Sequence, residues 1–579
     1  WLSYIDALIK EKQFENAKQV FEQAKTQGVS EEKLNVLETQ LTPTAQINEP
    51  KLAVQNKSLS FSQKRKKLSE QKKRKKKVTK QNLKANNPSQ KQLDSLLEHY
   101  QNGRFNDAEK LAVSITNEFP KHQFSWKVLG AVLGATGRKS EAVDANQTAV
   151  ALSPQDAEAH SNLGNALKEL GRLDEAEASF NQAIVLKPDY AQAHSNLGVM
   201  LKDLGRLEEA LASYTQAIAL KPDFAQAHYN LAITFKELGR LYEAEVSYKQ
   251  AIALKPDYAE AHINLGNTLK ELGKLDEALA SYNQAIALKP DYADALYNRS
   301  LLLFDKAEFE DALRDADACV SKKARVLTLT SLYALGRIDE IYKRIEIQSK
   351  VDGEDIRIAA FAAFISELEK KPTTYNFCPN PIDFIHIANL SSHVNDSVTY
   401  LGDVIEELNK IETIWEPFGK STVSGFQSLK HINVFANPSG KMKQLKSFIL
   451  NELDAYYLKF QSEQCSYIQK FPTTRNLWGW TVILKQQGHQ DAHIHPSGWL
   501  SGVIYLKVVP SLGKDEGSIE FSLNGKQYQN INSPCLTFQP REGDIVFFPS
   551  SLHHRTIPFT TDTDRIIVSF DLIPEAATH

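Results

Sequence analysis

The feature that most constrains this chain is a period of 34 residues that runs through its first half. One copy spans Ala157–Tyr190 and reads AEAHSNLGNALKELGRLDEAEASFNQAIVLKPDY, and close copies follow it. A fixed period of this length is typical of stacked helical units, in which each unit contacts only its neighbours. Prolines mark the period, at Pro120, Pro154, Pro188, Pro222, Pro256 and Pro290.

Each unit is predicted to be a pair of helices. Leu163 and Leu167 are one turn apart in the first helix, and Gly171 can end that helix in the left-handed conformation. Neither helix can bury its apolar face alone, so the fold depends on the stacking of neighbours. The apolar face of the second helix recurs at i, i+4 and i+7, with Ala176, Phe180 and Ala183.

This unit resembles the tetratricopeptide repeat (TPR), whose small, aromatic and proline positions match Gly164, Ala176, Phe180, Ala183 and Pro188. Degraded copies extend the pattern in both directions. We therefore expect a repeat array over residues 91–325 and a degenerate repeat or helical cap over 326–375. The resemblance implies an all-α superhelix that binds a protein or peptide partner.

Two segments precede the array. Residues 1–44 have the spacing of a repeat-like helical fragment with Trp1 at its tryptophan position, so we expect the protein to extend upstream. Residues 45–90 are predicted to be a basic, disordered linker, because residues 51–91 hold fifteen Lys and Arg and one acidic residue, Glu70. A nucleic-acid contact is the alternative, but the linker lacks interleaved aromatic side chains for base stacking. We interpret it as a charged spacer.

An asparagine recurs at the same point of the first helix in successive repeats. Helical position predicts that this ladder lies on the concave side, where an amide can hold a peptide backbone without reading its sequence. Glycosyltransferases that modify Ser and Thr carry a similar ladder in their TPR arrays, so the resemblance implies peptide binding. Recent duplication of the repeats is the alternative explanation. The ladder consists of Asn162, Asn196, Asn230, Asn264 and Asn298.

The composition favours a cytoplasmic protein. No run of about 18 apolar residues is present, so the sequence predicts no membrane segment. The four cysteines fit neither a disulfide framework nor a zinc-binding spacing, which favours a reducing compartment. They are Cys319, Cys378, Cys465 and Cys535.

From residue 376 onward the period stops and short β-branched and aromatic runs separated by turn residues replace it. This texture predicts an antiparallel sandwich or barrel over residues 376–579, preceded by helices near Val404–Lys410 and Met442–Phe460. The predicted strands are residues 479–485, 500–509, 517–523, 543–549 and 565–572.

A group of histidines within this region predicts a metal site. His493 and His495 alternate, so both imidazoles would lie on one side of a strand. His554 and Arg565 come from later strands. Two ligands from one strand, a third from a distant strand and a basic residue in the same barrel suit a facial metal site with open positions. The alternative is a set of satisfied polar residues in a β-sandwich.

The segments GWTVILKQQGHQDAHIHPSGWLSGVIYLK, GDIVFFPSSLHHRTIPF and DRIIVSFDL resemble the 2-oxoglutarate/Fe(II) oxygenases of prokaryotes and marine phages. The resemblance implies a double-stranded β-helix (jelly roll) with flanking helices. It also implies that His493, His495 and His554 hold Fe(II), and that the enzyme uses 2-oxoglutarate and O₂ to hydroxylate a substrate. Arg565 would bind the distal carboxylate of 2-oxoglutarate, and Tyr505 would provide a second contact.

One position departs from the family pattern, which is His-x-Asp/Glu followed by a distal histidine, because residue 495 is a histidine. Either iron accepts His495, or a nearby carboxylate such as Asp491 or Glu520 completes the site. His553 is an alternative to His554, and His489 is interpreted as a loop residue.

The leading hypothesis is therefore a two-module enzyme: a TPR array that recruits a polypeptide, and a dioxygenase domain. The alternative is a non-catalytic TPR scaffold whose barrel serves protein–protein interaction. A third hypothesis is that the barrel acts on a small molecule or glycan.

Overall fold

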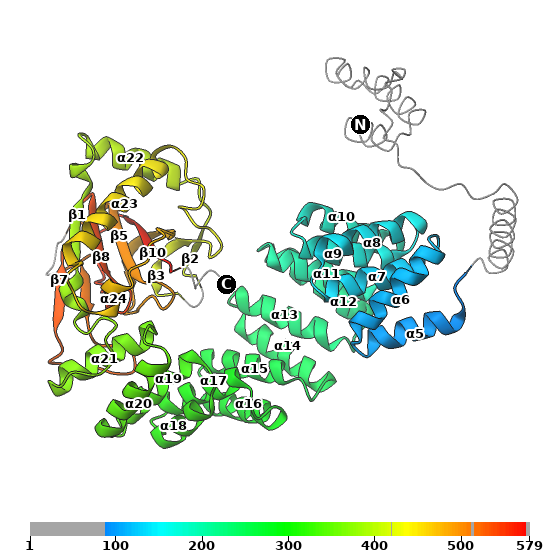
Figure 1. Ribbon diagram of the computed structural model, residues 1–579, viewed down its shortest axis with the longest axis horizontal. Coiled ribbons are helices and arrows are strands. Elements are labelled where there is room, and N and C mark those ends of the chain that lie inside the picture. The colour runs from blue at the N-terminus through cyan, green and yellow to red at the C-terminus, as the bar shows by residue number, and fades with distance from the viewer. Residues whose placement is uncertain (1–86, 418–419, 511–514, 575–579) are drawn as a thin grey trace, which may run out of the picture. The chain divides into compact units, whose positions relative to one another are not determined.

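The computed structural model describes residues 87–417, 420–510 and 515–574 (Figure 1). The predicted N-terminal fragment and nearly all of the predicted linker fall outside these ranges. The first half of the described chain is a series of antiparallel helix pairs, which confirms the all-α superhelix. The helices are α5 (Gln90–Gln101), α6 (Phe105–Glu118), α7 (Gln123–Ala135), α8 (Lys139–Leu152), α9 (Ala157–Glu169), α10 (Leu173–Leu186), α11 (Ala191–Asp203), α12 (Leu207–Leu220), α13 (Ala225–Glu237), α14 (Leu241–Leu254), α15 (Ala259–Glu271), α16 (Leu275–Leu288), α17 (Ala293–Asp305), α18 (Phe309–Ala318), α19 (Lys322–Ala334), α20 (Ile338–Val351) and α21 (Ile356–Glu369).

Two glycines of the repeat at residues 157–190 explain how its helix pair closes. Gly171 follows α9 with φ +82°, the left-handed conformation predicted for the helix end. Gly164 lies where the partner helix crosses, and a Cβ there would come within 2.7 Å of the Phe180 ring. The glycine therefore admits the aromatic side chain that fills the space between the two helices.

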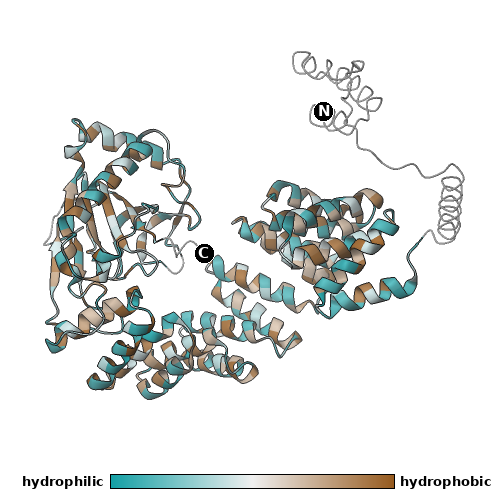
Figure 2. Cartoon of the chain, in the orientation of Figure 1, coloured by the Kyte–Doolittle hydropathy of each residue, from teal (hydrophilic) through white to brown (hydrophobic). Residues whose placement is uncertain are grey.

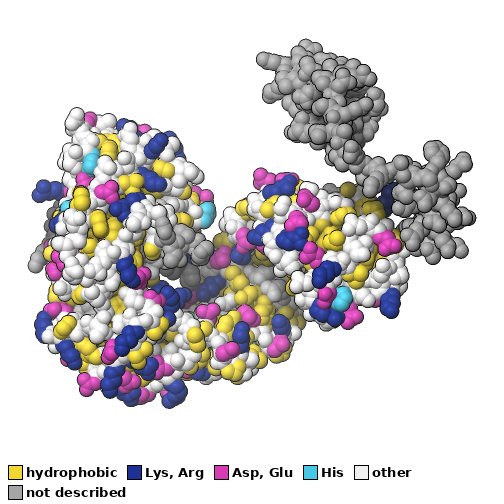
Figure 3. Space-filling model, viewed as in Figure 1, with side chains coloured by type: hydrophobic (Ala, Val, Ile, Leu, Met, Phe, Trp, Pro, Cys, Tyr) yellow, Lys and Arg dark blue, Asp and Glu magenta, His cyan; other side chains and the backbone are white. Residues whose placement is uncertain are grey.

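The helices alternate hydrophobic and hydrophilic residues along their length (Figure 2), as expected of helices that bury one stripe. Lys, Arg, Asp and Glu are interspersed on the visible face of the array (Figure 3). Many of them pair between neighbouring repeats; Arg206, for example, contacts Glu209 at 2.6 Å and Glu177 at 2.7 Å. None of the helices in the described ranges combines the length and the hydrophobicity of a membrane-crossing segment.

The rest of the described chain contains two antiparallel sheets with helices packed beside them (Figure 1). The larger sheet has the order β1-β8-β5-β10-β4-β3-β2, and the smaller one has the order β7-β6-β9. The flanking helices are α22 (Ser397–Leu408), α23 (Gly440–Phe460) and α24 (Ser466–Gln469). The strands are β1 (His386–Asn389), β2 (Thr413–Trp415), β3 (Thr422–Ser428), β4 (Leu477–Gln490), β5 (Leu500–Lys507), β6 (Ile519–Ser522), β7 (Cys535–Phe538), β8 (Asp544–Pro549), β9 (His553–Thr556) and β10 (Arg565–Leu572).

The chain passes repeatedly between the two sheets, which is the connectivity on which the predicted double-stranded β-helix rests. After β4 the chain reaches the smaller sheet, where His493 forms an isolated bridge with His554 of β9. It then returns to the larger sheet in β5. It then enters β6 and β7, crosses back to β8, and alternates once more through β9 and β10. The site residues thus come from strands of both sheets.

All five predicted strand segments contain observed strands, and both predicted helices correspond to α22 and α23. The local structure at residues 493–495 differs from the prediction. His493 forms only a single bridge, because the chain turns at Pro496 and Ser497 before β5 begins. The strands β1, β2, β3, β7 and β9 were not predicted.

The last helices share one hydrophobic core with the sheets. Tyr528, from the connection between β6 and β7, packs against Phe361 and Phe364 of α21 at ring-centroid distances of 5.0 and 4.8 Å. The hydroxyl of Tyr333 in α19 donates to the carbonyl of Gln529 at 3.3 Å. The region of two sheets, called the barrel from here on, is therefore held against α19 and α21 by side-chain packing as well as by the continuous chain.

Candidate metal centre and carboxylate site

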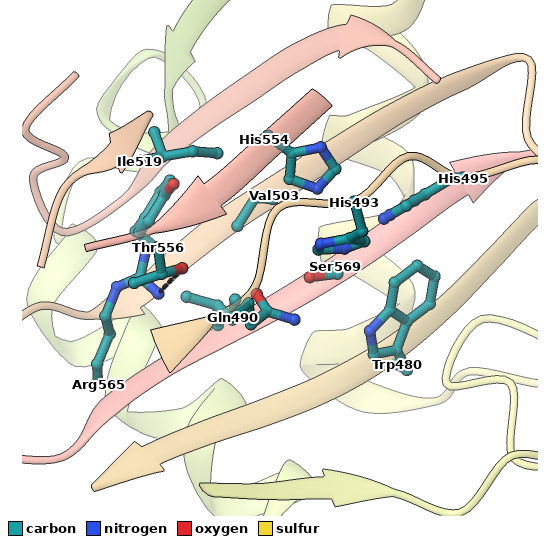
Figure 4. Close-up of a pocket in the computed structure, with 12 residues that line it drawn as sticks. Trp480, Gln490, His493, His495, Val503, Ile519, His554, Thr556, Arg565 and Ser569 are labelled. Atoms are coloured by element: carbon teal, nitrogen blue, oxygen red, sulfur yellow. Dashed lines mark hydrogen bonds between the residues drawn. The ribbon is translucent and has the colours of Figure 1, made fainter. Parts of the chain in front are cut away.

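The three predicted histidines converge between the two sheets (Figure 4). His493 and His495 lie in the turn between β4 and β5, and His554 lies in β9. One ring nitrogen from each lies within 4.8 Å of the others, and their ring centroids are 4.4 to 5.1 Å apart. This spacing lets three nitrogens share one ion.

Each imidazole is oriented through its Nδ1 atom. The Nδ1 of His493 lies 2.6 Å from the carbonyl of Asp491, and the Nδ1 of His554 lies 3.2 Å from the carbonyl of Leu552. The Nδ1 of His495 lies 2.6 Å from Oδ1 of Asp571. Carbonyl and carboxylate oxygens accept only, so we assign the proton to Nδ1 in all three rings. Nε2 then keeps its lone pair for a metal, the arrangement typical of histidine ligands.

Burial keeps the imidazoles of His493 and His554 uncharged. Desolvation, and next the charge of His495, lowers the pKa of His493 to about 3. Desolvation likewise holds the pKa of His554 well below its ordinary value, with smaller contributions from His493 and His495. Both rings are therefore neutral near pH 7, and neutral imidazole is the form that binds metals.

A buried guanidinium lies at the other end of the same crevice (Figure 4). Arg565 is 1% exposed, and its Nη1 donates to Oγ1 of Thr556 at 3.1 Å. Its Nε has no hydrogen-bond partner, and it forms no ion pair with any carboxylate in the described ranges. A buried charged donor without an acceptor is costly, so this group fits a ligand anion.

Tyr505 faces Arg565 from β5. The guanidinium carbon lies 5.1 Å from the centre of its ring, and its buried hydroxyl has no hydrogen-bond partner. Burial raises the pKa of Tyr505 to about 12, so the phenol stays protonated and can donate. Together, the two side chains direct unused hydrogen-bond donors into the inner crevice.

A cleft of about 870 Å³ borders the histidines from outside. Trp480, Gln490, His493 and His495 line both this cleft and the narrow inner crevice that contains Arg565. His493 and His495 thus lie where the inner crevice with Arg565 meets the outer cleft. The cleft is also lined by Lys420, Lys430, Asn433, Asn476 and Trp478.

The other candidates lie outside this cluster. The side chain of Asp491 is 74% exposed, and Glu520 forms an ion pair with Arg555 at 2.6 Å. His553 points to the other side of β9 from its neighbour, where its ring packs against Tyr528 at 5.7 Å. The prediction that His489 is a loop residue is wrong: it lies in β4 and pairs with Val423 of β3, and its Nδ1 lies 3.1 Å from the carbonyl of Gln487. The carboxylate that the structure brings closest to the cluster is Asp571.

Asp571 is the main residue that the sequence reasoning missed. It contacts His495 directly, together with Ser501. The sequence contains a signal that could have identified Asp571. It lies six residues after Arg565 in a predicted strand, so the two side chains lie on the same face. A polar residue at that position in an otherwise apolar strand marks the same site.

The asparagine ladder is half-buried in every repeat. Part of its hydrogen-bonding capacity serves contacts between repeats: the amide of Asn196 donates to Ser161 at 3.2 Å, and that of Asn264 donates to Tyr229 at 2.8 Å. Asn298 donates to Asn267 at 3.0 Å. The ladder amides therefore also help to set the stacking of the repeats.

Comparison with protein families supports the two-part interpretation. Five segments match the TPR repeat model, and residues 479–571 match the model described as "Putative 2OG-Fe(II) oxygenase". The TPR segments are 130–171, 164–202, 200–239, 234–273 and 266–306. The recognition of TPR repeats followed by an oxygenase-type domain is thus confirmed.

Similar solved structures are TPR proteins. YrrB, described as a TPR protein with an unusual peptide-binding site, is 25% identical; the match covers 34% of this chain and 99% of YrrB, with a TM-score of 0.28. Pseudomonas aeruginosa PilF is 18% identical over 36% of this chain and 98% of its own, with a TM-score of 0.32. The Cut9–Hcn1 structure is 19% identical over 41% of this chain and 48% of that one, with a TM-score of 0.36. The comparison with curated proteins returned no match.

Proposed function

We propose that this protein is an Fe(II)- and 2-oxoglutarate-dependent dioxygenase that hydroxylates a substrate, and that its TPR array binds a protein or peptide. The observation that carries the proposal is the convergence of three imidazoles, each oriented through Nδ1, beside a buried arginine that lacks an anionic partner in the described ranges. A purely structural barrel has no use for this combination.

The residues present fit both cofactors. His493, His495 and His554 would hold Fe(II), and Arg565 with Tyr505 would bind the distal carboxylate of 2-oxoglutarate. When bound, the iron and the keto acid supply oxidative chemistry in which O₂ is consumed and the keto acid is decarboxylated. The protein orients the carboxylate through a guanidinium fixed by Thr556 and keeps water from the buried crevice.

The outer cleft would admit the substrate. It borders His493 and His495 on the side away from Arg565, so a substrate and the keto acid could occupy the site together. Its volume of about 870 Å³ exceeds that of the inner crevice and suits a side chain with part of its backbone. A cytoplasmic protein partner delivered by the array is the substrate we propose, with a small molecule or glycan as the alternative.

The experiment that tests the enzyme proposal is an anaerobic titration of the full chain with Fe(II) and 2-oxoglutarate. We expect a weak metal-to-ligand charge-transfer band that disappears in His493→Ala. His489→Ala is the matched control, because the ring of this β4 histidine lies near the carbonyl of Gln487 and the carboxylate of Asp491 and is not among the three that converge. If the wild-type chain gives no band and takes up no metal, the barrel is a non-catalytic interaction domain.

The array is tested separately. The combined substitution of Asn196, Asn230 and Asn264 by Ala should abolish capture of peptide partners without changing the charge-transfer band. Unchanged capture would mean that the ladder reflects repeat ancestry and stacking alone. A mass increase of one oxygen atom on captured partners would identify them as substrates, whereas its absence on partners of an active enzyme would favour the small-molecule alternative.

A further inference from the structure

Asp571 is a buried carboxylate with an unusual set of partners. It is 8% exposed and lies near the end of β10, a strand paired on both sides by β4 and β5. Its Oδ1 accepts from Nδ1 of His495 at 2.6 Å and from the hydroxyl of Ser501 at 2.7 Å. Ser501 is in turn 2.8 Å from the hydroxyl of Ser550.

Lys420 lines the same cleft and acts on this carboxylate only through its charge, without an ion-pair contact in the described ranges. In the described ranges its one ion-pair partner is His495, which carries a charge only when it is protonated. Burying an unpaired carboxylate is strongly unfavourable, so such groups occur beside a cation or a metal. His495 is one of the three residues that can hold an ion, and with Nδ1 bonded to Asp571 its Nε2 is the atom left for that ion.

The backbone leaves room for this contact. A Cβ on Gly498 would lie 3.0 Å from the carboxylate carbon of Asp571 and 2.6 Å from Oγ of Ser550. A glycine therefore allows the turn that carries His495 to approach the end of β10. The arrangement depends on a close approach that larger residues would prevent.

The net charge at a metal site indicates a role for the contact between Asp571 and His495. A facial site of two histidines and one carboxylate leaves one net positive charge around a divalent ion. A site of three neutral histidines leaves two net positive charges around the same ion. A carboxylate bonded to the far nitrogen of one histidine restores the lower value, because it makes that imidazole a stronger, more anionic donor.

We infer that Asp571 is a positioning residue that supplies, through His495, the negative charge which a carboxylate ligand supplies in a two-histidine, one-carboxylate site. The inference rests on the proposed function. It explains why residue 495 can be a histidine without loss of charge balance at the metal. Asp571 and Arg565 lie on the same face of β10, so a single strand both anchors the cosubstrate and tunes the metal.

The test measures Mn(II) affinity of the metal-free full chain by electron paramagnetic resonance, without turnover. We expect Asp571→Asn to raise the Kd about 10- to 100-fold, the range seen when partners of metal-binding histidines are lost. The amide can still accept the hydrogen bond from His495, so the change removes mainly the charge. Circular dichroism monitors folding of each variant.

A double-mutant comparison separates charge from scaffolding. In His495→Asp the carboxylate binds the metal directly and Asp571 becomes a repulsive neighbour, so adding Asp571→Asn should leave the Kd equal or lower. If Asp571→Asn raises the Kd by the same factor in both backgrounds, or in neither, the inference is wrong. If the single variant Asp571→Asn does not fold, the two variants that contain His495→Asp still test the inference, and a Kd raised by Asp571→Asn in that background would overturn it.

Ser501→Ala provides the matched control, because it removes one hydrogen bond to Asp571 and keeps the charge. We expect its Kd to stay within about fivefold of the wild type, and an effect as large as that of Asp571→Asn would overturn the charge role. Absence of Mn(II) binding by the wild-type chain would overturn the proposed function itself. Binding that is insensitive to Asp571 would overturn only this inference.

Discussion

The helical array and the barrel reach stability in opposite ways. In the array each helix packs against the next one in sequence, and the buried side chains fall into separate clusters, such as those around Phe180 with Tyr214 and around Tyr248 with Tyr282. In the barrel, strands far apart in sequence pair with one another, as β1 does with β8, and one continuous core joins them to the last helices.

This difference extends to function. The array repeats one feature, the half-buried asparagine ladder, so under the proposed function each copy would contribute a part of the binding energy. The barrel assembles a single site from β5, β9, β10 and the turn after β4, and each side chain there occurs once. Single substitutions should therefore have graded effects in the array and all-or-none effects in the barrel.

The largest effect is expected at β9, where two neighbouring histidines point to opposite sides. His554→Ala should weaken metal binding by at least about 100-fold, because it removes one of three ligand atoms. His553→Ala should retain metal binding, because this ring packs on Tyr528 instead. Isothermal titration with Mn(II) measures both, and equal losses would contradict the assignment of the ligand.

The next effect concerns the buried guanidinium. Arg565→Leu should raise the Kd for 2-oxoglutarate about 10- to 100-fold, as expected for the loss of charged hydrogen bonds, while Mn(II) binding persists. Arg555→Leu is the control, because that arginine pairs with Glu520 outside the crevice. Unchanged 2-oxoglutarate binding in Arg565→Leu would place the cosubstrate elsewhere.

Two glycines that each face an aromatic ring test the comparison directly. A Cβ on Gly502 in β5 would lie 2.2 Å from the Phe570 ring, and one on Gly198 would lie 2.7 Å from the Tyr214 ring. We expect Gly502→Ala to lower the free energy of unfolding of the barrel by about 1–3 kcal/mol.

Gly198→Ala should cost less than about 1 kcal/mol, because alanine favours the helix and Ala232 already occupies the equivalent position against Tyr248. Hydrogen exchange with mass spectrometry would locate each effect, confined to neighbouring repeats for Gly198→Ala and spread through the barrel for Gly502→Ala. A barrel-wide change from Gly198→Ala would show that the two regions unfold together.

The smallest effect is expected for one member of the ladder. Asn196→Ala should weaken peptide capture only about two- to fivefold, in line with one neutral hydrogen bond. Asn181→Ala in α10 is the control, since this exposed asparagine lies off the ladder. Complete loss of capture from Asn196→Ala alone would mean that one repeat dominates binding.

Much of the fold was predictable because its signals are local. The 34-residue period predicted the helix pairs, and Gly171 and Gly164 have the conformation and the close approach expected of them. The short strands β7 and β9 escaped prediction because their pairing partners, rather than their own residues, define them. The turn at His493 and His495 was mistaken for a strand because Pro496 ends the pairing after one bridge.

Periodicity and residue types with few structural uses were enough to predict the stacked helical repeats, the change to an antiparallel sandwich or barrel, and the group formed by His493, His495, His554 and Arg565. The folded chain was needed to see that the three imidazoles converge, that His553, Asp491 and Glu520 lie apart from them, and that Asp571 contacts His495. Those relations join residues tens of positions apart, and strand pairing across two sheets is what brings them within bonding distance.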